Sequence, residues 1–247
     1  MKKTNFGRFV RTALAVVALA GAQWSVADVA VGSVIKLDSS AGNLGGGAFT
    51  ASVVSGAGFG GPSFQTFCLE YQEHLSYGQS LLVGGISNAT VNGNNAYYAS
   101  DALANPEGGL HTANSDPLSK ATEWLFTQFY NNKTAYAGTT ALSNSTQRAI
   151  WFLEGELYTT SLMNDYLADT NAVSFVSAAN TAVAGGWTDV GDRVRVLNLF
   201  KGANFTEHAQ DQLYMVTAVP EPGTYGMMLV GAGLIGTIIR RRKNKNV

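Results

Sequence analysis

The sequence predicts an α+β domain in which a helical segment is inserted between two groups of antiparallel strands. Alternating apolar and polar residues, typical of half-buried strands, occur on both sides of the middle of the chain. In the middle itself, apolar residues recur at spacings of three and four, which predicts helices packed on a core. Glycine-rich turns after the early strands favour short antiparallel connections, so we expect an antiparallel β core.

The first group of strands has four expected members, and the third contains the single cysteine of the chain, Cys68. Residues 42–46 and 56–61 are the glycine-rich turns that follow the first two strands. The fourth pattern is the weakest, and residues 92–115 after it hold scattered Asn, Gly, Pro and Asp, which predict mostly loop with one short helix. The expected strands cover residues 29–37, 47–54, 63–71 and 80–91.

The helical segment begins with a helix at residues 118–131, whose apolar stripe is interrupted only by Gln128. A second helix is expected from an N-cap at Ser143 or Ser145 to about Tyr158, because a serine side chain accepts a hydrogen bond from the first helical turn. The remaining elements are helices at 161–168 and 172–184, the latter ended by Gly185 and Gly186, and strands at 192–200 and 211–219.

The N-terminus has the features of a secretory signal peptide over residues 1–27. An apolar stretch at 12–22 follows several basic residues, and small residues end the segment at a plausible cleavage site. We therefore expect export and a mature domain at residues 28–219. The alternative, a short membrane anchor, is disfavoured because the apolar stretch is too short to cross a bilayer. The basic residues are Lys2, Lys3, Arg8 and Arg11, and the small ones are Ser25, Val26 and Ala27.

Residues 220–247 combine a Pro-Glu-Pro motif, an uncharged stretch at 224–239 and a basic run. As a single transmembrane helix the uncharged stretch would be about 24 Å long, slightly short of a hydrocarbon core of roughly 30 Å. The basic run is expected to act as the membrane stop and to stay cytoplasmic. The motif is formed by Pro220, Glu221 and Pro222, and the stop by Arg240, Arg241 and Arg242.

This order of elements resembles the PEP-CTERM sorting signal. The resemblance implies a Gram-negative bacterium that secretes exopolysaccharide, and handling by the export machinery and by an exosortase, a membrane transpeptidase-like enzyme that acts near the Pro-Glu-Pro motif. It implies a protein held at least transiently in the inner membrane and then placed at the cell surface or in the extracellular matrix. Composition alone also allows an ordinary C-terminal anchor.

The mature domain is acidic although the whole chain is nearly neutral. Residues 28–219 contain seven Lys and Arg and sixteen Asp and Glu, a net charge of −9. This balance argues against nucleic acid, or an anionic polysaccharide, held by simple charge attraction.

Cys68 and Gln147 suggest a specific reaction. A lone cysteine in an exported protein has no internal disulfide partner. Its thiolate can instead attack a glutamine carboxamide, expel ammonia and leave an internal thioester. Gln147 is expected in the first turn of its helix, where the partial positive charge of the helix end would lower the thiol pKa and stabilise the oxyanion.

The residues around this pair suggest how the reaction is assisted. Phe67 and Trp151 would keep water from the product. Glu154, or alternatively Glu70 and Glu73, would move a proton to the departing ammonia, and the sequence does not choose among these carboxylates.

The motif Phe67-Cys68-Leu69, followed by a Thr-Gln motif at 146–151, resembles bacterial thioester domains, the TQXA-type adhesin domains. The resemblance implies that Cys68 is the thioester sulfur and Gln147 the acyl donor, in a β-barrel or sandwich with a helical subdomain. It also implies covalent coupling to an amine or hydroxyl of a polysaccharide or protein partner. The best-known members carry Gram-positive anchors, which differ from this tail. The matching motif residues are Thr146, Ala149, Ile150 and Trp151.

Other functions have weaker sequence support. The histidines, His74, His111 and His208, form no ligand-spaced cluster, so neither a metal site nor a cofactor is expected, and the chain is not expected to be an enzyme. A cysteine hydrolase lacks its usual local signature around Cys68. The main alternative is a noncovalent matrix or carbohydrate-binding module in which the cysteine is an inert core residue.

Overall fold

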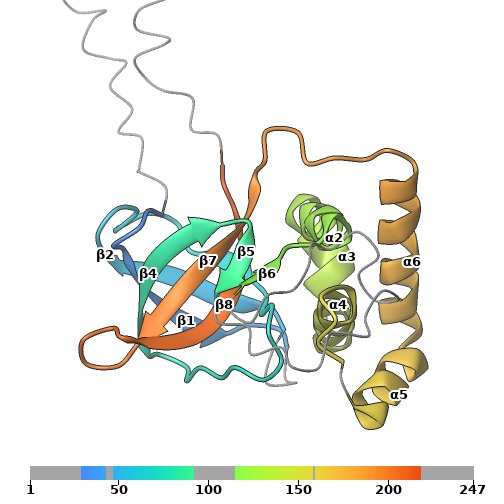
Figure 1. Ribbon diagram of the computed structural model, residues 1–247, viewed down its shortest axis with the longest axis horizontal. Coiled ribbons are helices and arrows are strands. Elements are labelled where there is room, and N and C mark those ends of the chain that lie inside the picture. Colours follow the sequence, from blue (N-terminus) through green and yellow to red (C-terminus); the bar gives the residue numbers. More distant parts are fainter. Residues whose placement is uncertain (1–28, 43–46, 92–114, 158, 218–247) are drawn as a thin grey trace, which may run out of the picture. The chain divides into compact units, whose positions relative to one another are not determined.

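The computed structural model describes residues 29–42, 47–91, 115–157 and 159–217, and in these ranges an antiparallel sheet is flanked on one side by helices (Figure 1). The main sheet has six strands in the order β3-β2-β1-β4-β7-β8, and a small sheet pairs β5 with β6. The mixed α+β class is confirmed. The strands are β1 (Val34–Ser39), β2 (Phe49–Ser55), β3 (Phe64–Thr66), β4 (Ser80–Ser87), β5 (Ala89–Val91), β6 (Ser115–Pro117), β7 (Val194–Lys201) and β8 (Glu207–Met215).

The expectation of a closed barrel or a sandwich was wrong, because the main sheet is open, with β3 and β8 as its edges. The ladder of β3 with β2 stops at Thr66, so no continuous ladder joins the two edges. The chain just after β3 meets β8 in an isolated bridge and not in a continuous ladder. There, Leu213 N donates to Phe67 O at 3.0 Å and Leu69 N donates to Asp211 O at 3.2 Å. Between these bonds Cys68 lies opposite Gln212 in an isolated antiparallel bridge.

The predicted strands have different bounds in the structure, and the first begins at Val34 instead of residue 29. The predicted strand 63–71 shrinks to β3, and 80–91 is divided into β4 and β5. The last strand begins and ends earlier than predicted, at Glu207–Met215. The predicted loop and short helix at 92–115 lie outside the described residues, except for Ser115, which begins β6.

The helices form the second part of the domain, and α2, α3 and α4 lie between the sheet and α6 (Figure 1). The helices predicted over 118–131, 161–168 and 172–184 are confirmed with small shifts of their ends, and Gly185 is the C-cap of the last one as expected. α3 was not predicted. The helices are α2 (Lys120–Asn131), α3 (Lys133–Ala137), α4 (Thr140–Leu153), α5 (Thr160–Ala168) and α6 (Thr170–Ala184).

The start of α4 differs from the prediction in a way that matters for the site. Its N-cap is Thr139, whose side chain accepts from Leu142 N, and not Ser143 or Ser145. Those two serines lie inside the helix and contact neighbouring segments instead. Ser143 Oγ accepts from Ala48 N at 2.9 Å, and Ser145 Oγ donates to the Asp169 carboxylate at 2.8 Å.

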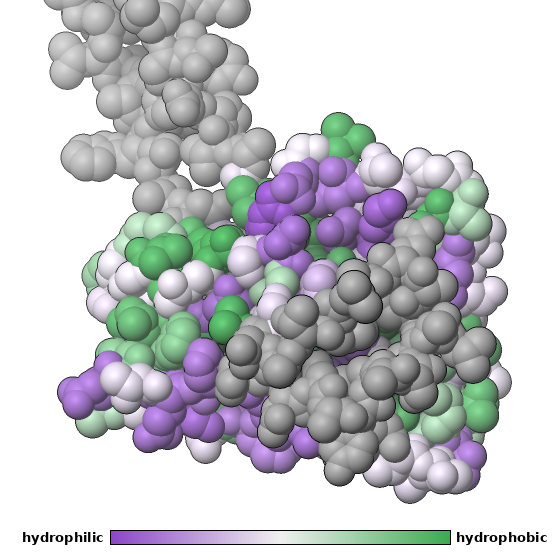
Figure 2. All heavy atoms as spheres, in the orientation of Figure 1, coloured by the Kyte–Doolittle hydropathy of each residue, from purple (hydrophilic) through white to green (hydrophobic). Residues whose placement is uncertain are grey.

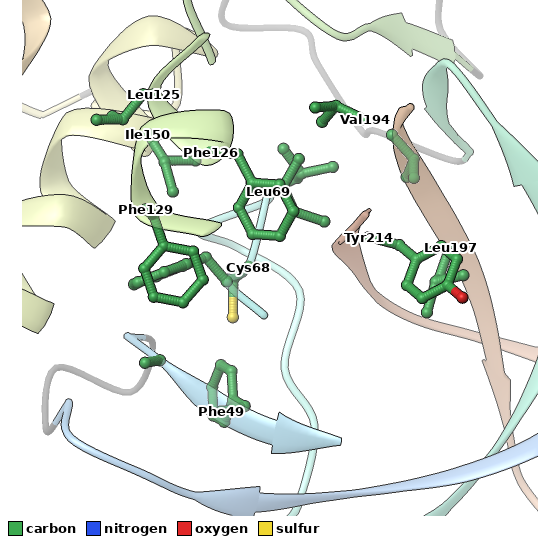
Figure 3. Packing of buried hydrophobic residues seen from close by; sticks show 14 of the residues in the cluster. Phe49, Cys68, Leu69, Leu125, Phe126, Phe129, Ile150, Val194, Leu197 and Tyr214 are labelled. Carbon is green, nitrogen blue, oxygen red and sulfur yellow. The ribbon is translucent and has the colours of Figure 1, made fainter. Parts of the chain in front are cut away.

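The hydrophobic core is continuous between the sheet and the helices (Figure 3). Cys68 lies between Phe129 of α2 and Phe49 of β2, with its sulfur directed toward the strand that carries Phe49. The rings of Phe67 and Phe129 meet edge to face, with centroids 4.9 Å apart. Because these rings are fully buried, replacing either by alanine is expected to cost about 3–5 kcal/mol of stability.

The two ends of the described domain meet at one place. Val29 N donates to the hydroxyl of Tyr214 at 3.3 Å, so the start of the domain is tied to the end of β8. The predicted signal peptide, sorting motif and membrane-spanning segment lie outside the described residues. Within the described ranges, none of the helices combines the length and apolar character that crossing a membrane requires.

The surface mixes hydrophilic and hydrophobic residues on the face shown in Figure 2. Among the described residues, the large apolar side chains that are exposed come from separate turns and helices. They are Val31, Phe59, Tyr77, Tyr130, Leu167, Val173 and Val190.

Candidate functional site

Cys68 and Gln147 lie side by side in the structure, although 79 residues separate them. The Oε1 atom of Gln147 accepts from Cys68 N at 3.1 Å, and its Nε2 atom donates to Cys68 O at 2.8 Å. Both residues are completely buried. The carboxamide therefore has a fixed position against the backbone of the cysteine.

A second backbone N–H holds the same oxygen. Gly47 N donates to Gln147 Oε1 at 2.8 Å, so two N–H groups converge on the atom that would carry negative charge after attack on the carboxamide. Gly47 has a φ of +113°, and a Cβ there would lie 2.7 Å from Gly42 Cα. Only glycine fits this close approach without displacing the backbone.

The expected source of this stabilisation was therefore wrong. Gln147 is two turns into α4, not in its first turn, so the free N–H groups of the helix end are not beside it. The donors come instead from the segment before β2 and from the segment after β3.

The environment of the sulfur also differs from the prediction. Burial raises the pKa of the Cys68 thiol well above its ordinary value; a hydrogen bond from Gln212 opposes this rise, and the nearby Glu70 adds to it. The expectation that a helix end lowers this pKa was wrong. Gln212 Nε2 lies 3.5 Å from Cys68 Sγ. The resting group is a neutral thiol.

The predicted apolar surroundings are buried as a group. Phe67, Ala149, Ile150 and Trp151 are each at most 3% exposed. The Trp151 ring packs edge to face against Tyr71, with centroids 4.9 Å apart. These contacts keep bulk water away from the pair. Thr146, in contrast, donates to Tyr136 O at 2.6 Å and fastens α3 to α4.

The predicted proton carriers hold other positions. Glu154 Oε1 accepts a hydrogen bond from the hydroxyl of Ser119, the N-cap residue of α2, at 2.8 Å. Glu70 Oε2 accepts from Asp211 N at 3.1 Å. No hydrogen bond described for Glu154 or Glu70 reaches Cys68 Sγ or Gln147 within the described ranges. Burial raises the pKa of Glu154, and burial with the charges of Asp211 and Glu73 raises that of Glu70 to about 10.

Sequence reasoning missed Gly47 and Gln212. Gly47 directly follows the glycine-rich turn at 42–46, and a run of glycines before a strand is a signal for close backbone approach. Gln212 ends a run of three polar residues, Gln210 to Gln212, at the start of a predicted strand, and polar side chains in such a position signal buried hydrogen bonds. Neither signal says which distant residue is the partner.

Comparison with protein families gives a match near the C-terminus. The PEP-CTERM protein-sorting motif matches residues 218–243, which include Pro220 to Pro222 and Arg240 to Arg242. No curated protein and no solved structure matches the chain. The matched segment carries a PEP-CTERM sorting motif, which indicates an exported, membrane-transiting protein that is sorted and processed by an exosortase.

Proposed function

We propose that this chain is an exported protein of the cell surface or exopolysaccharide matrix, in which Cys68 and Gln147 form an internal thioester. The observation that carries the proposal is the Gln147 carboxamide, which is held against the backbone of Cys68 by two hydrogen bonds. The sorting motif supports the location.

The proposed reaction needs no external reactant. Cys68 Sγ bonds to Cδ of Gln147, and the carbonyl oxygen becomes an oxyanion that the N–H groups of Gly47 and Cys68 hold. The thiol proton moves to Nε2, the C–N bond breaks and ammonia leaves. The product is a thioester and the protein has lost the mass of one ammonia.

The bond would act first as a link between the sheet and the helices, because it joins α4 to the segment after β3. By analogy with a disulfide closing a loop of this length, it would stabilise the fold by roughly 4 kcal/mol. Burial of both residues protects the acyl carbon from water.

Coupling to a partner is the second step that we propose. Local opening of the segments around Cys68 would let an amine or hydroxyl of a polysaccharide or protein attack the acyl carbon. The new bond is an amide or ester on the side chain of Gln147, and the Cys68 thiol is released. Each molecule reacts once, so the chain is not an enzyme.

Intact mass spectrometry of the mature secreted protein tests the proposal. We expect a mass lower than the sequence mass by one ammonia, and a Cys68 that iodoacetamide does not alkylate under denaturing conditions. Methylamine should then add to Gln147 and release the thiol. Gln147→Glu is the matched control, since it keeps the oxygen but has no ammonia to lose. A wild-type protein with the full sequence mass and a freely alkylated Cys68 would rule the thioester out.

A noncovalent matrix or carbohydrate-binding module is the second candidate. The complete burial of Cys68 and its raised thiol pKa favour it, because buried structural cysteines are usually inert. Matrix retention distinguishes the two candidates. Retention that is the same in Cys68→Ala and Gln147→Ala as in the wild type supports the noncovalent module.

A further inference from the structure

Gln212 is the residue that faces the sulfur of Cys68. It lies on β8 and pairs with Cys68 in the isolated bridge between the two edges of the sheet. Residues paired in this way direct their side chains to the same side of the sheet. The two side chains meet, with Nε2 of Gln212 at 3.5 Å from Sγ, and both residues are completely buried.

The orientation of the Gln212 amide is set by its other contacts. Its Nε2 atom also donates to the backbone oxygen of Gln210 at 3.4 Å. Because that backbone oxygen can only accept, the nitrogen of the Gln212 amide, and not its oxygen, must face it. Its Oε1 atom faces the hydroxyl of Thr66, at 3.5 Å. An N–H group, and not the carbonyl oxygen, therefore points toward the sulfur.

An N–H donor at this position has a chemical consequence. The thiolate, not the thiol, is the nucleophile, and burial makes the thiolate costly to form. A donor aimed at sulfur favours the charged form and also limits where the sulfur can sit. The N–H groups of Gly47 and Cys68 hold the oxygen of Gln147, so the two reacting groups have separate supports.

We infer that Gln212 is a positioning residue for thioester formation, which holds the sulfur of Cys68 toward Gln147 and stabilises its ionised form. The inference rests on the proposed function, because it has no meaning unless the thioester forms. It assigns a role to β8, the edge strand opposite the one that leads to Cys68.

The rate at which ammonia is lost tests this role. The mature chain is recovered unfolded from inclusion bodies, with Gln147 intact, then refolded between about pH 6 and 10 and followed by intact mass. In Gln212→Met, which keeps the length but has no donor, we expect formation to be about tenfold slower at neutral pH, the effect of one pKa unit on the thiolate fraction. The slowing should persist over this pH range, because burial holds the pKa of the thiol above it in both proteins.

The chain offers a matched control two residues away. Gln210 lies on the same strand and is also buried, but its Nε2 atom donates to Glu70 O at 2.5 Å and not to sulfur. Gln210→Met should keep the wild-type pH profile. If Gln212→Met does not fold by circular dichroism, Gln212→Leu replaces it, since it also lacks a donor, and ammonia loss should again be slower than in Gln210→Met.

The outcomes separate the inference from the proposed function. A wild-type chain that never loses ammonia overturns the proposed function. A wild type that loses ammonia, with an unchanged rate and pH profile in the Gln212 variants, overturns only the role of Gln212. Equal slowing at every pH in Gln212→Met and Gln210→Met also overturns it, because it reveals a purely structural effect.

Discussion

Gly47 combines two properties that no other residue type supplies at its position. Its positive φ directs the backbone N–H to the oxygen of Gln147, and its lack of a side chain admits the backbone of Gly42. The hydrogen bond from Gly47 N to the Gln147 carboxamide therefore requires a residue without a Cβ atom at this position.

Gly47→Ala should slow thioester formation by about tenfold or more, because the added Cβ displaces a donor that holds the oxyanion. The measurement is ammonia loss on refolding, followed by intact mass. Gly60→Ala is the control, since Gly60 also has a positive φ, of +78°, but a Cβ there meets nothing within 4 Å. Both variants should lose about 1 kcal/mol of stability from the strained φ, and Gly47→Ala should lose more because its Cβ clashes with Gly42. Equal rates in the two variants would contradict the role of Gly47.

The contact between Cys68 and Gln147 could be predicted from the sequence, but the residues that surround it could not. Cys68 and Gln147 stand out because each lies in a recognisable motif. Gly47 and Gln212 have only local signals, and their contacts depend on how the segment before β2 and the edge strand β8 meet the cysteine. Contacts between segments that are distant in the sequence arise only in the folded chain, so local sequence patterns do not predict them.

At the scale of elements, Asp169 joins α4 to α6. It is the N-cap of α6, accepting from Ala172 N, and it also accepts from Ser145 and forms an ion pair with Arg148 at 2.7 Å. Burial alone would raise the pKa of Asp169, but the hydrogen bonds from Ala172, Ser145 and Arg148 outweigh it and lower that pKa.

Asp169→Ala should lower the free energy of unfolding by about 2 kcal/mol, from the lost cap of α6 and the lost charged hydrogen bond with Arg148. Urea denaturation measures it. The control is Asp165→Ala on the exposed face of α5, which should change stability by less than about 0.5 kcal/mol. A loss of the same size in both variants would show that Asp169 does not join the helices.

The same contacts explain why the start of α4 could not be predicted. Thr139, Ser143 and Ser145 are all suitable N-caps, so composition does not choose among them. The choice is made by partners outside the helix, since Ser143 is engaged by Ala48 and Ser145 by Asp169. The sequence pattern predicts that the helix forms, but tertiary contacts determine the residue at which it begins.

At the scale of the whole molecule, several carboxyl groups are buried where the sheet meets the helices and the small sheet. Burial, with the charges of neighbouring acids, raises the pKa of Glu70 to about 10 and of Asp116 to about 9, and burial raises that of Asp211 to about 7. The folded state therefore keeps protons that the unfolded chain releases above about pH 4.

The stability of the domain should consequently fall as the pH rises. A group whose pKa is higher in the folded state than in the unfolded state stabilises the fold fully at a pH below its unfolded-state pKa. This stabilisation is lost as the pH rises through the folded-state pKa. We expect the free energy of unfolding to drop by at least about 1 kcal/mol between pH 5 and pH 9. Urea denaturation of Cys68→Ala, which cannot form the thioester, measures this without interference from thioester hydrolysis.

Glu70→Gln in the same Cys68→Ala background is the comparison variant. It removes the carboxyl with the largest of these three pKa values. The free energy of unfolding should therefore fall less between pH 5 and pH 9. A free energy of unfolding that increases from pH 5 to pH 9 would contradict the expected protonation of these groups.

The bond between Val29 N and the Tyr214 hydroxyl has a practical consequence for labelling this protein. Because Val29 meets Tyr214, a fluorophore placed at the start of the described domain would report from beside the end of β8. The β7–β8 hairpin turns at Gly202, at the far end of those strands. A tag inserted at this exposed turn would lie at the opposite end of β7 and β8 from the Val29 contact, and would leave that contact undisturbed.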